Sequence, residues 1–277
     1  MTHDWLTVRR GEAPLIVSVP HAGTDLPAAM QARLMSPWLA RKDADWWVQR
    51  LYDFAEGIGA TTVSTAVSRT VIDVNRDPSG VSLYPGQATT GLCPTTTFDG
   101  EPLYRDGEAP DEAEIAERRR AFFDPYHVAL SAEVERLRER HGQVVLYEAH
   151  SIRSQIPRLF DGVLPHLNIG TNSGFSCDSA LTSAVAGLCA ASNLSLAVNG
   201  RFKGGWTTRR YGDPGAGVHA IQMELACRGY MREPIGPPSP DSWPAPYDPA
   251  TAAPMRAMLT RILAACIAFA DPSWSPP

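Results

Sequence analysis

The chain has 277 residues, of which 44% are hydrophobic and 20% are charged, and its formal net charge is −5 at pH 7. The acidic balance argues against nucleic-acid binding, because neutralising a phosphate backbone requires a basic face. We expect a cytoplasmic protein that binds no membrane, because no apolar run approaches the length of a membrane helix and the first residues carry no signal-peptide pattern.

Short apolar runs predict buried strands, and helical patterns separate them. In chain order, strands are expected at 15–19, 61–64, 71–74, 143–147 and 220–225. Helices are expected from Asp43 to Gly57, from Asp124 to Gly142, and over 178–191 and 249–270, with Asp43 and Asp124 as N-caps. The alternation favours an α/β protein with a mostly parallel sheet, and we expect a single domain over residues 1–277.

Reactive side chains follow several predicted strands at the point where each strand ends. His21 follows the first of these strands, and His150 follows the fourth. Asn75 and Arg76 follow the third, and Glu224 lies near the end of the fifth. Ligands in open α/β sheets bind at the carboxyl ends of the strands. If the sheet is parallel, these groups converge on one edge.

Two histidines leave a catalytic metal site incomplete, because such a site typically has three protein ligands and one open position. Asp43 and Asp45 are candidates for the third ligand. Either acid can instead serve only as a helix cap or first-turn acid, and a histidine after a strand can be a hydrogen-bonded loop residue. Because His21 and His150 occupy equivalent places at two strand ends, a metal site is as well supported as these alternatives.

Glu224 lies in a segment whose side chains alternate strictly between apolar and polar. Gln222 and Glu224 face one side of the predicted strand, and the apolar residues face the other. The alternation alone slightly favours a position for Glu224 on the solvent-facing side of an edge strand. The alternative is a carboxylate aimed into a site, where it could take a proton from metal-bound water.

Basic residues cluster in two places despite the acidic net charge. Arg69 and Arg76 flank the predicted strand 71–74, and Arg201 and Arg209 lie in a segment rich in glycine and aromatic residues. Such a segment can approach a ligand closely, and arginine suits bidentate recognition of a carboxylate. A phosphate would satisfy the same chemistry, but the usual phosphate-cradling glycine motifs are missing from the sequence. A solvated charged loop is the alternative.

A series of motifs, in order along residues 15–231, resembles the N-formylglutamate amidohydrolase family. The motifs are VPHAGT at 19–24, DADW at 43–46, SR at 68–69, DVNR at 73–76, LYPGQ at 83–87, TFDG at 97–100, HSIR at 150–153, PRLFDG at 157–162, the arginine-rich run 199–212 and QME at 222–224. So many ordered motifs are far more specific than one short pattern.

The resemblance implies a fold, an activity and a metal site. The fold would be similar to that of zinc carboxypeptidases, an α/β fold with a mixed, mostly parallel central sheet flanked by helices. The activity would be a zinc-dependent release of formate from N-formyl-L-glutamate, late in one route of histidine degradation. His21, Asp45 and His150 would be ligands of one Zn²⁺ ion, with Asp43 as the alternative to Asp45, and Glu224 would be the general base.

The same resemblance implies roles for the polar and basic side chains. Arg69, Asn75 and Arg76 would hold a substrate carboxylate or polarise the scissile carbonyl, and Arg76 is our first choice for stabilising the oxyanion. Arg201 and Arg209 would bind the second carboxylate. The expected partner is therefore a small N-acyl amino acid.

A few positions depart from the family pattern. Trp47, Glu148, Trp206 and Arg210 stand where other residue types are common. These departures bear on the acyl group and the side chain that the enzyme prefers, because the expected ligands are intact. The alternatives are a hydrolase of another N-acyl amino acid and a non-catalytic protein that binds dicarboxylates without a metal.

Overall fold

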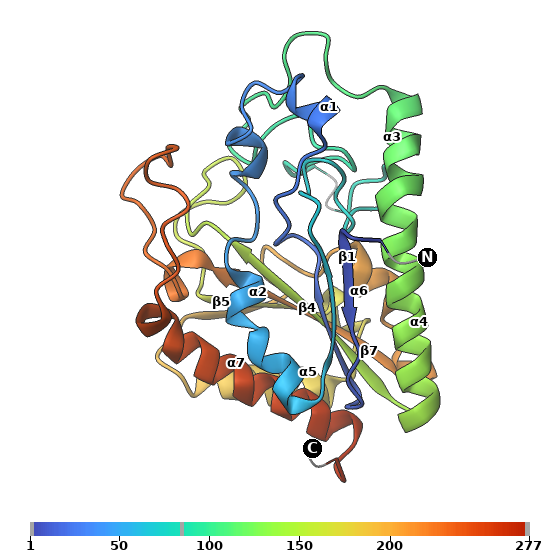
Figure 1. Cartoon of the computed structure of the whole chain (residues 1–277). Coiled ribbons are helices and arrows are strands. Elements are labelled where there is room, and N and C mark those ends of the chain that lie inside the picture. Colours follow the sequence, from blue (N-terminus) through green and yellow to red (C-terminus); the bar gives the residue numbers. More distant parts are fainter. Residues whose placement is uncertain (1–2, 84–85, 275–277) are drawn as a thin grey trace.

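The computed structural model describes residues 3–83 and 86–274, and a seven-stranded sheet in the order β1-β3-β2-β4-β7-β5-β6 runs through its centre (Figure 1). The pairs β2–β3, β2–β4, β4–β7 and β5–β6 are parallel, whereas β1–β3 and β5–β7 are antiparallel. The expected α/β class with a mixed, mostly parallel sheet is confirmed. The strands are β1 (Leu6–Arg9), β2 (Leu15–Val19), β3 (Thr61–Thr65), β4 (Val144–Ile152), β5 (Leu167–Gly170), β6 (Leu196–Val198) and β7 (Val218–Ala226).

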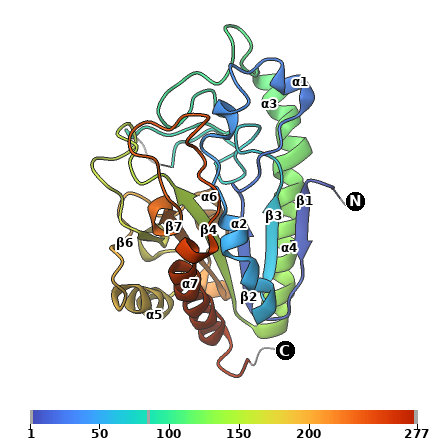
Figure 2. The same ribbon diagram turned by 60° about the vertical axis from the view of Figure 1, so that its left-hand side comes forward.

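Helices flank both faces of the sheet, as expected (Figures 1 and 2). The predicted strands at 15–19, 61–64, 143–147 and 220–225 correspond to β2, β3, β4 and β7, and three predicted helices correspond to α4, α5 and α7. The single domain expected over residues 1–277 stays a prediction. The helices are α1 (Ala28–Gln31), α2 (Val48–Leu51), α3 (Glu112–Arg118), α4 (Asp124–His141), α5 (Ser179–Ala190), α6 (Trp206–Tyr211) and α7 (Pro249–Ala270).

One face of the sheet is covered by α4. Its apolar stripe is buried against apolar side chains of β2, β3, β4 and β7, and Gly142 ends the helix with a φ of 77°. Asp124 is not the N-cap that the sequence predicts, because α3 and a π-helical turn at Arg119–Phe123 lead directly into α4. The stripe consists of Tyr126, Leu130, Val134 and Leu137.

The other face of the sheet carries α5 and α7, together with α2 (Figure 2). Asp178 caps α5 by accepting a hydrogen bond from Ala180 N, so the helix begins one residue after the start expected from the sequence. Among the described residues, α7 is the one helix long and apolar enough to cross a membrane. Leu259 and Ile262 of α7 are fully buried against the sheet, and each such side chain contributes about 1.5–3 kcal/mol on burial. This packing is that of a core helix.

The strand predicted at 71–74 does not form, although its residues are buried. The backbone turns instead, because Val71 N donates to Ser68 O and Arg76 N donates to Asp73 O. The Asp73 carboxylate stabilises the turn by accepting a hydrogen bond from Asn75 N at 2.9 Å. Burial of β-branched residues in a turn produces the same sequence pattern as a buried strand.

The helix predicted from Asp43 to Gly57 is also wrong. The segment forms a loop, the single helical turn of α2 and a 3-10 turn at Asp53–Ile58. Asp45 N donates to His21 O at 3.0 Å, and Trp47 takes a left-handed conformation with a φ of 67°. The chain therefore leaves helical geometry where it brings Asp45 next to His21.

Candidate metal centre and active-site pocket

The candidate site lies at the carboxyl ends of the parallel strands β2, β4 and β7. His21 follows β2, whereas His150 lies within β4, which is longer than the sequence predicts. Glu224 of β7 pairs with His150 across the two strands. β7 lies between β4 and β5, so the edge-strand alternative for Glu224 is wrong.

On one face of β4 and β7, the side chains near the carboxyl ends of the strands are polar. Glu148 and His150 alternate along β4, and Gln222 and Glu224 are their partners on β7. All four side chains are buried, with Glu224 only 8% exposed. Buried polar residues on neighbouring central strands require partners, and they find them in the site.

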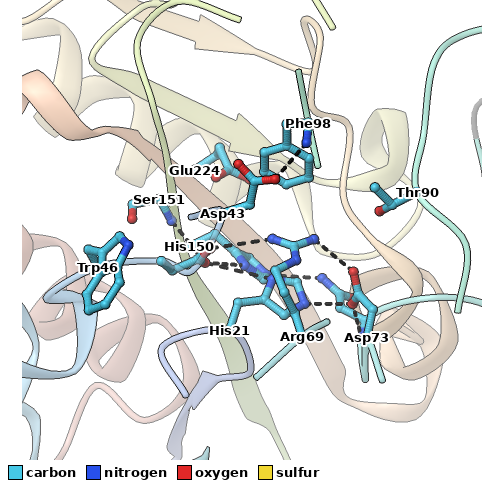
Figure 3. Close-up of polar contacts among 12 residues, drawn as sticks. His21, Asp43, Trp46, Arg69, Asp73, Thr90, Phe98, His150, Ser151 and Glu224 are labelled. Carbon is cyan, nitrogen blue, oxygen red and sulfur yellow. Dashed lines mark hydrogen bonds and ion pairs between the residues drawn. The ribbon is translucent and has the colours of Figure 1, made fainter. Parts of the chain in front are cut away.

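His21, Asp45 and His150 form a buried cluster in which the candidate ligand atoms all lie within 4.8 Å of one another. Asp45 Oδ2 lies 3.0 Å from His150 Nδ1 and 3.8 Å from His21 Nδ1. Figure 3 shows the two imidazoles side by side beneath Asp43 and Glu224. The structure thus brings together the three residues expected as ligands.

Two buried carboxylates lie behind the imidazoles. Asp73 Oδ1 accepts a hydrogen bond from His21 Nε2 at 2.6 Å, and Glu148 Oε2 lies 3.3 Å from His150 Nε2. Metal-binding histidines usually donate their second ring N–H to such a carboxylate, which fixes the tautomer. Because Nε2 of His21 carries the proton, the lone pair of its Nδ1 faces the cluster.

Two atoms of the cluster lack hydrogen-bond partners in the part of the chain that the structure describes, as expected if the cluster binds a cation. Within the described residues, His21 Nδ1 and Asp45 Oδ1 are buried and have no hydrogen-bond partner. Buried polar atoms without a partner are rare and costly, so these two atoms call for a ligand. Two imidazoles and a carboxylate are a common donor set for a catalytic zinc ion.

The pKa values of the cluster follow from its burial and charges. Burial lowers the pKa of His21, and the Arg69 charge lowers it further. Burial opposes the charged form of His150, but hydrogen bonds with Asp45 and Glu148 raise its pKa to about 10. The cluster without a cation therefore favours a proton on His150, and an ion that binds Nδ1 must displace that proton.

A pocket opens beside this cluster and contains most of the expected substrate-binding residues. Its lining includes Arg69, Asn75, Arg76 and Arg201, whereas Arg209 is not among the lining residues. Arg209 lies on α6, and its Nε donates to Gly204 O. The remaining lining residues are His21, Ala88, Thr89, Thr90, Phe98, His150, Ser151, Ile152, Leu159, Phe202, Gly205, Gln222 and Glu224.

The lining side chains differ in their contacts. Arg69 donates to Asp73 Oδ2 at 2.8 Å and lies 3.5 Å from Asp45 Oδ1, so it braces the cluster (Figure 3). Arg76 has a more open side chain, 21% exposed against 9% for Arg69. The Asn75 amide lies 3.0 Å from His150 Nε2.

Asp43 is turned away from the cluster. Its Oδ2 accepts a hydrogen bond from Phe98 N at 2.6 Å, and its Oδ1 lies 3.2 Å from Arg153 Nη2. Burial raises the pKa of Asp43, and the Arg153 charge opposes that shift. Of the two candidate acids, Asp45 is the one that meets both histidines.

The sequence predicts no role in the site for Asp73, Glu148 or Gln222, which the structure places there. Glu148 departs from the family pattern, and it shares a strand face with His150 two residues later. The same period-2 signal connects Gln222 with Glu224. Asp73 carried no such signal, because its contacts with His21 and Arg69 depend on a turn rather than on a strand.

Comparison with known proteins identifies the family. The family model for N-formylglutamate amidohydrolase matches residues 13–231, which include every residue of the cluster and of the pocket lining. The chain belongs to the N-formylglutamate amidohydrolase family. It is 46% identical over 260 residues to an N-formylglutamate deformylase of Pseudomonas aeruginosa, covering 94% of this chain and 96% of that protein.

Two further proteins are similar to the chain over nearly its whole length. An N-formylglutamate deformylase of Pseudomonas putida is 44% identical over 265 residues, covering 95% of this chain and 96% of that protein. The crystal structure of N-formylglutamate amidohydrolase from Ralstonia eutropha JMP134 superposes with a TM-score of 0.76 at 23% identity. That likeness covers 96% of this chain and 97% of the other and shows the shared fold.

Proposed function

We propose that the protein is a zinc-dependent amidohydrolase that releases formate from N-formyl-L-glutamate. The observation that carries the proposal is the meeting of His21, Asp45 and His150 at one point, with Glu224 paired to His150 in the same pocket. The deformylase relatives that span nearly the whole chain support the choice of substrate.

His21, Asp45 and His150 would hold the ion, through the atoms that converge in the cluster. When bound, a zinc ion supplies Lewis-acid chemistry, lowering the pKa of water toward ~7 and polarising a carbonyl. Asp73 and Glu148 keep the two imidazoles in the tautomer that binds through Nδ1.

Glu224 moves the proton in this proposal. Burial raises its pKa to about 8, although the charges of His150, Arg69 and Arg76 act in the opposite direction. A cation in the cluster would act against this shift and favour the ionised form, and the carboxylate can then take a proton from the attacking water and give it to the leaving amine nitrogen. The amine leaves as L-glutamate, and the former formyl carbon leaves as formate.

The pocket arginines bind and orient the dianionic substrate. Arg76 stabilises the charge that develops on the carbonyl oxygen, because its guanidinium is the more open of the two beside the cluster. Arg201 lines the pocket next to Phe202 and receives the second carboxylate. Arg69 and Asn75 support this arrangement through Asp73 and His150.

A substrate panel tests the activity. Zinc-loaded protein should hydrolyse N-formyl-L-glutamate with a higher kcat/KM than N-acetyl, N-succinyl or N-formimino amino acids. A preference for another acyl group would replace the substrate but keep the hydrolase. Tight dicarboxylate binding with no turnover and no bound metal would favour the non-catalytic alternative.

Metal analysis of His150→Ala tests the ligand set independently of turnover. The purified variant should lose the bound ion, because it keeps only two of three ligands. His166→Ala is a matched control, since His166 lies away from the pocket and bonds to Ser195 Oγ. A His150→Ala protein with one ion per chain and full activity would exclude this ligand set.

A further inference from the structure

Phe98 forms a wall of the pocket at the end where the cluster lies. The side chain is 7% exposed and lines the pocket. Its ring centroid lies 4.8 Å from Arg69 Cζ, and Arg69 Nη1 in turn lies 3.5 Å from Asp45 Oδ1. The Arg69 guanidinium therefore lies against both the ring and the cluster.

A second phenylalanine in the same lining lies in a different environment. The ring of Phe202 lies 5.3 Å from Arg201 Cζ and packs edge-on against Phe160. Phe202 therefore accompanies the arginine that we assign to the second carboxylate. The two rings therefore lie beside different arginines of the pocket.

The position of Phe98 is fixed by the buried Arg153 and two half-buried carboxylates, Asp43 and Asp99. Phe98 N donates to Asp43 Oδ2 at 2.6 Å (Figure 3). Arg153 Nη2 bonds both Asp43 at 3.2 Å and Asp99, the next residue after Phe98, at 2.7 Å. Because Asp43 precedes Asp45 by two residues, these contacts tie the ring to the loop that carries the central carboxylate of the cluster.

We propose that Phe98 is a specificity-determining residue that restricts the acyl group to formyl, and that Asp43 is the residue that positions it. The inference rests on the proposed function and identifies the residue that selects the acyl group of the substrate. The scissile carbonyl must lie against the cluster and Glu224, so a substituent on the carbonyl carbon must occupy the space beside them. A formyl group carries only hydrogen there, whereas an acetyl group carries a methyl that meets the ring.

The test compares kcat/KM for N-acetyl-L-glutamate and N-formyl-L-glutamate in metal-loaded Phe98→Ala. The ratio of acetyl to formyl should rise by about tenfold or more over wild type, the range that a pocket achieves by rejecting one methyl group. Phe202→Ala is the matched control, in which the ratio should stay within about threefold of wild type while KM rises for both substrates. Phe98→Leu should give a smaller rise and serves if the alanine variant does not fold.

The role of Asp43 is tested by a conservative pair of variants. Asp43→Ala removes the acceptor of Phe98 N and should raise the acetyl-to-formyl ratio, as Phe98→Ala does. Asp43→Asn retains an oxygen acceptor and should keep the ratio near that of wild type. Both variants should bind one metal ion per chain, because Asp43 does not belong to the cluster.

Three results would contradict the inference. An unchanged ratio in folded, metal-loaded Phe98→Ala or Phe98→Leu would overturn the assignment of Phe98 and leave the proposed function intact. Loss of the metal in Asp43→Ala would overturn the positioning role and make Asp43 a ligand. A wild-type protein that cannot hydrolyse N-formyl-L-glutamate would overturn both the inference and the proposed function.

Discussion

Glu224 is a buried carboxyl among charges of both signs. Burial raises its pKa to about 8, with Asp45 acting in the same direction and His150, Arg69 and Arg76 acting against it. Gln222 Nε2 donates to Glu224 Oε2 at 3.3 Å, so the side chain is oriented by its neighbour on the same strand face. A glutamine at position 224 would keep the shape of the site and lose its capacity to accept a proton.

Glu224→Gln should therefore retain the metal and lose about two or more orders of magnitude in kcat, the usual contribution of a general base. Steady-state kinetics at matched metal content measures the effect. Glu139→Gln, at an exposed position of α4, should retain wild-type kcat. Turnover near the wild-type rate in Glu224→Gln would remove Glu224 from the proposed role.

His127 is a buried histidine outside the pocket lining, and it connects α4 with the turn before the site. Its Nε2–H donates to Val74 O at 2.8 Å, and its ring packs against Phe123 and Trp206. Burial lowers its pKa from 6.5 to about 4. Between these two pH values the unfolded chain binds a proton that the folded chain does not.

The free energy of unfolding should thus fall as pH decreases from 6.5 to about 4, by up to about 3 kcal/mol from this residue. Urea unfolding from pH 7 to pH 4.5 measures the slope. His127→Gln should be less stable at pH 7 because it loses ring packing, but its stability should depend less steeply on pH. If the free energy of unfolding depended equally steeply on pH in wild type and in His127→Gln, His127 would not be the residue responsible.

At the scale of elements, the start of α6 fits closely against the site. Gly205 is the N-cap of α6, and a Cβ on it would lie 2.4 Å from Asn75 Nδ2. Asn75 Nδ2 in turn lies 3.0 Å from His150 Nε2. A side chain at position 205 would consequently displace an amide that lies against a proposed ligand.

Gly205→Ala should weaken metal binding by about tenfold or more, the usual effect of losing an outer-shell partner. Gly187→Ala in α5 is the opposite case, because a Cβ there meets nothing within 4 Å, and it should stabilise the fold by about 0.5–1 kcal/mol. Metal titration and urea unfolding of both variants check this contrast. If Gly205→Ala bound the metal as tightly as wild type, the close approach of Gly205 to Asn75 would not affect the site.

Local patterns located several elements well and failed where long-range contacts shape the backbone. The helices α4 and α5 form close to where their local side-chain patterns predict them, because those patterns involve residues only a few positions apart. The turn at 71–74 is different, because Asp73 there bonds His21 and Arg69. Periodicity cannot distinguish such a buried turn from a strand.

At the scale of the whole molecule, the cluster links segments that are far apart in the chain. His21 follows β2, Asp45 lies in the loop before α2, and His150 belongs to β4. An ion bound by all three would stabilise only the folded state, since the unfolded chain does not bring them together.

Removing the metal with a chelator should lower the Tm, and restoring zinc should recover it. The loss corresponds to about 4 kcal/mol when the free metal exceeds Kd by about 1,000-fold. Thermal unfolding with and without chelator measures the shift. In His150→Ala the shift should largely disappear, and a shift as large as that of wild type would contradict the ligand set.

The sequence by itself determined the α/β class, the main strands and helices, and the residues His21, His150 and Glu224 near the ends of strands. These follow from side-chain periods and from the rule that parallel strands present their carboxyl ends at one edge. Only the tertiary structure decided that Asp45 rather than Asp43 meets the histidines, and that Asp73 and Glu148 lie behind them. The physical reason is that these contacts are set by where loops place short acidic side chains, and a local pattern does not encode that placement.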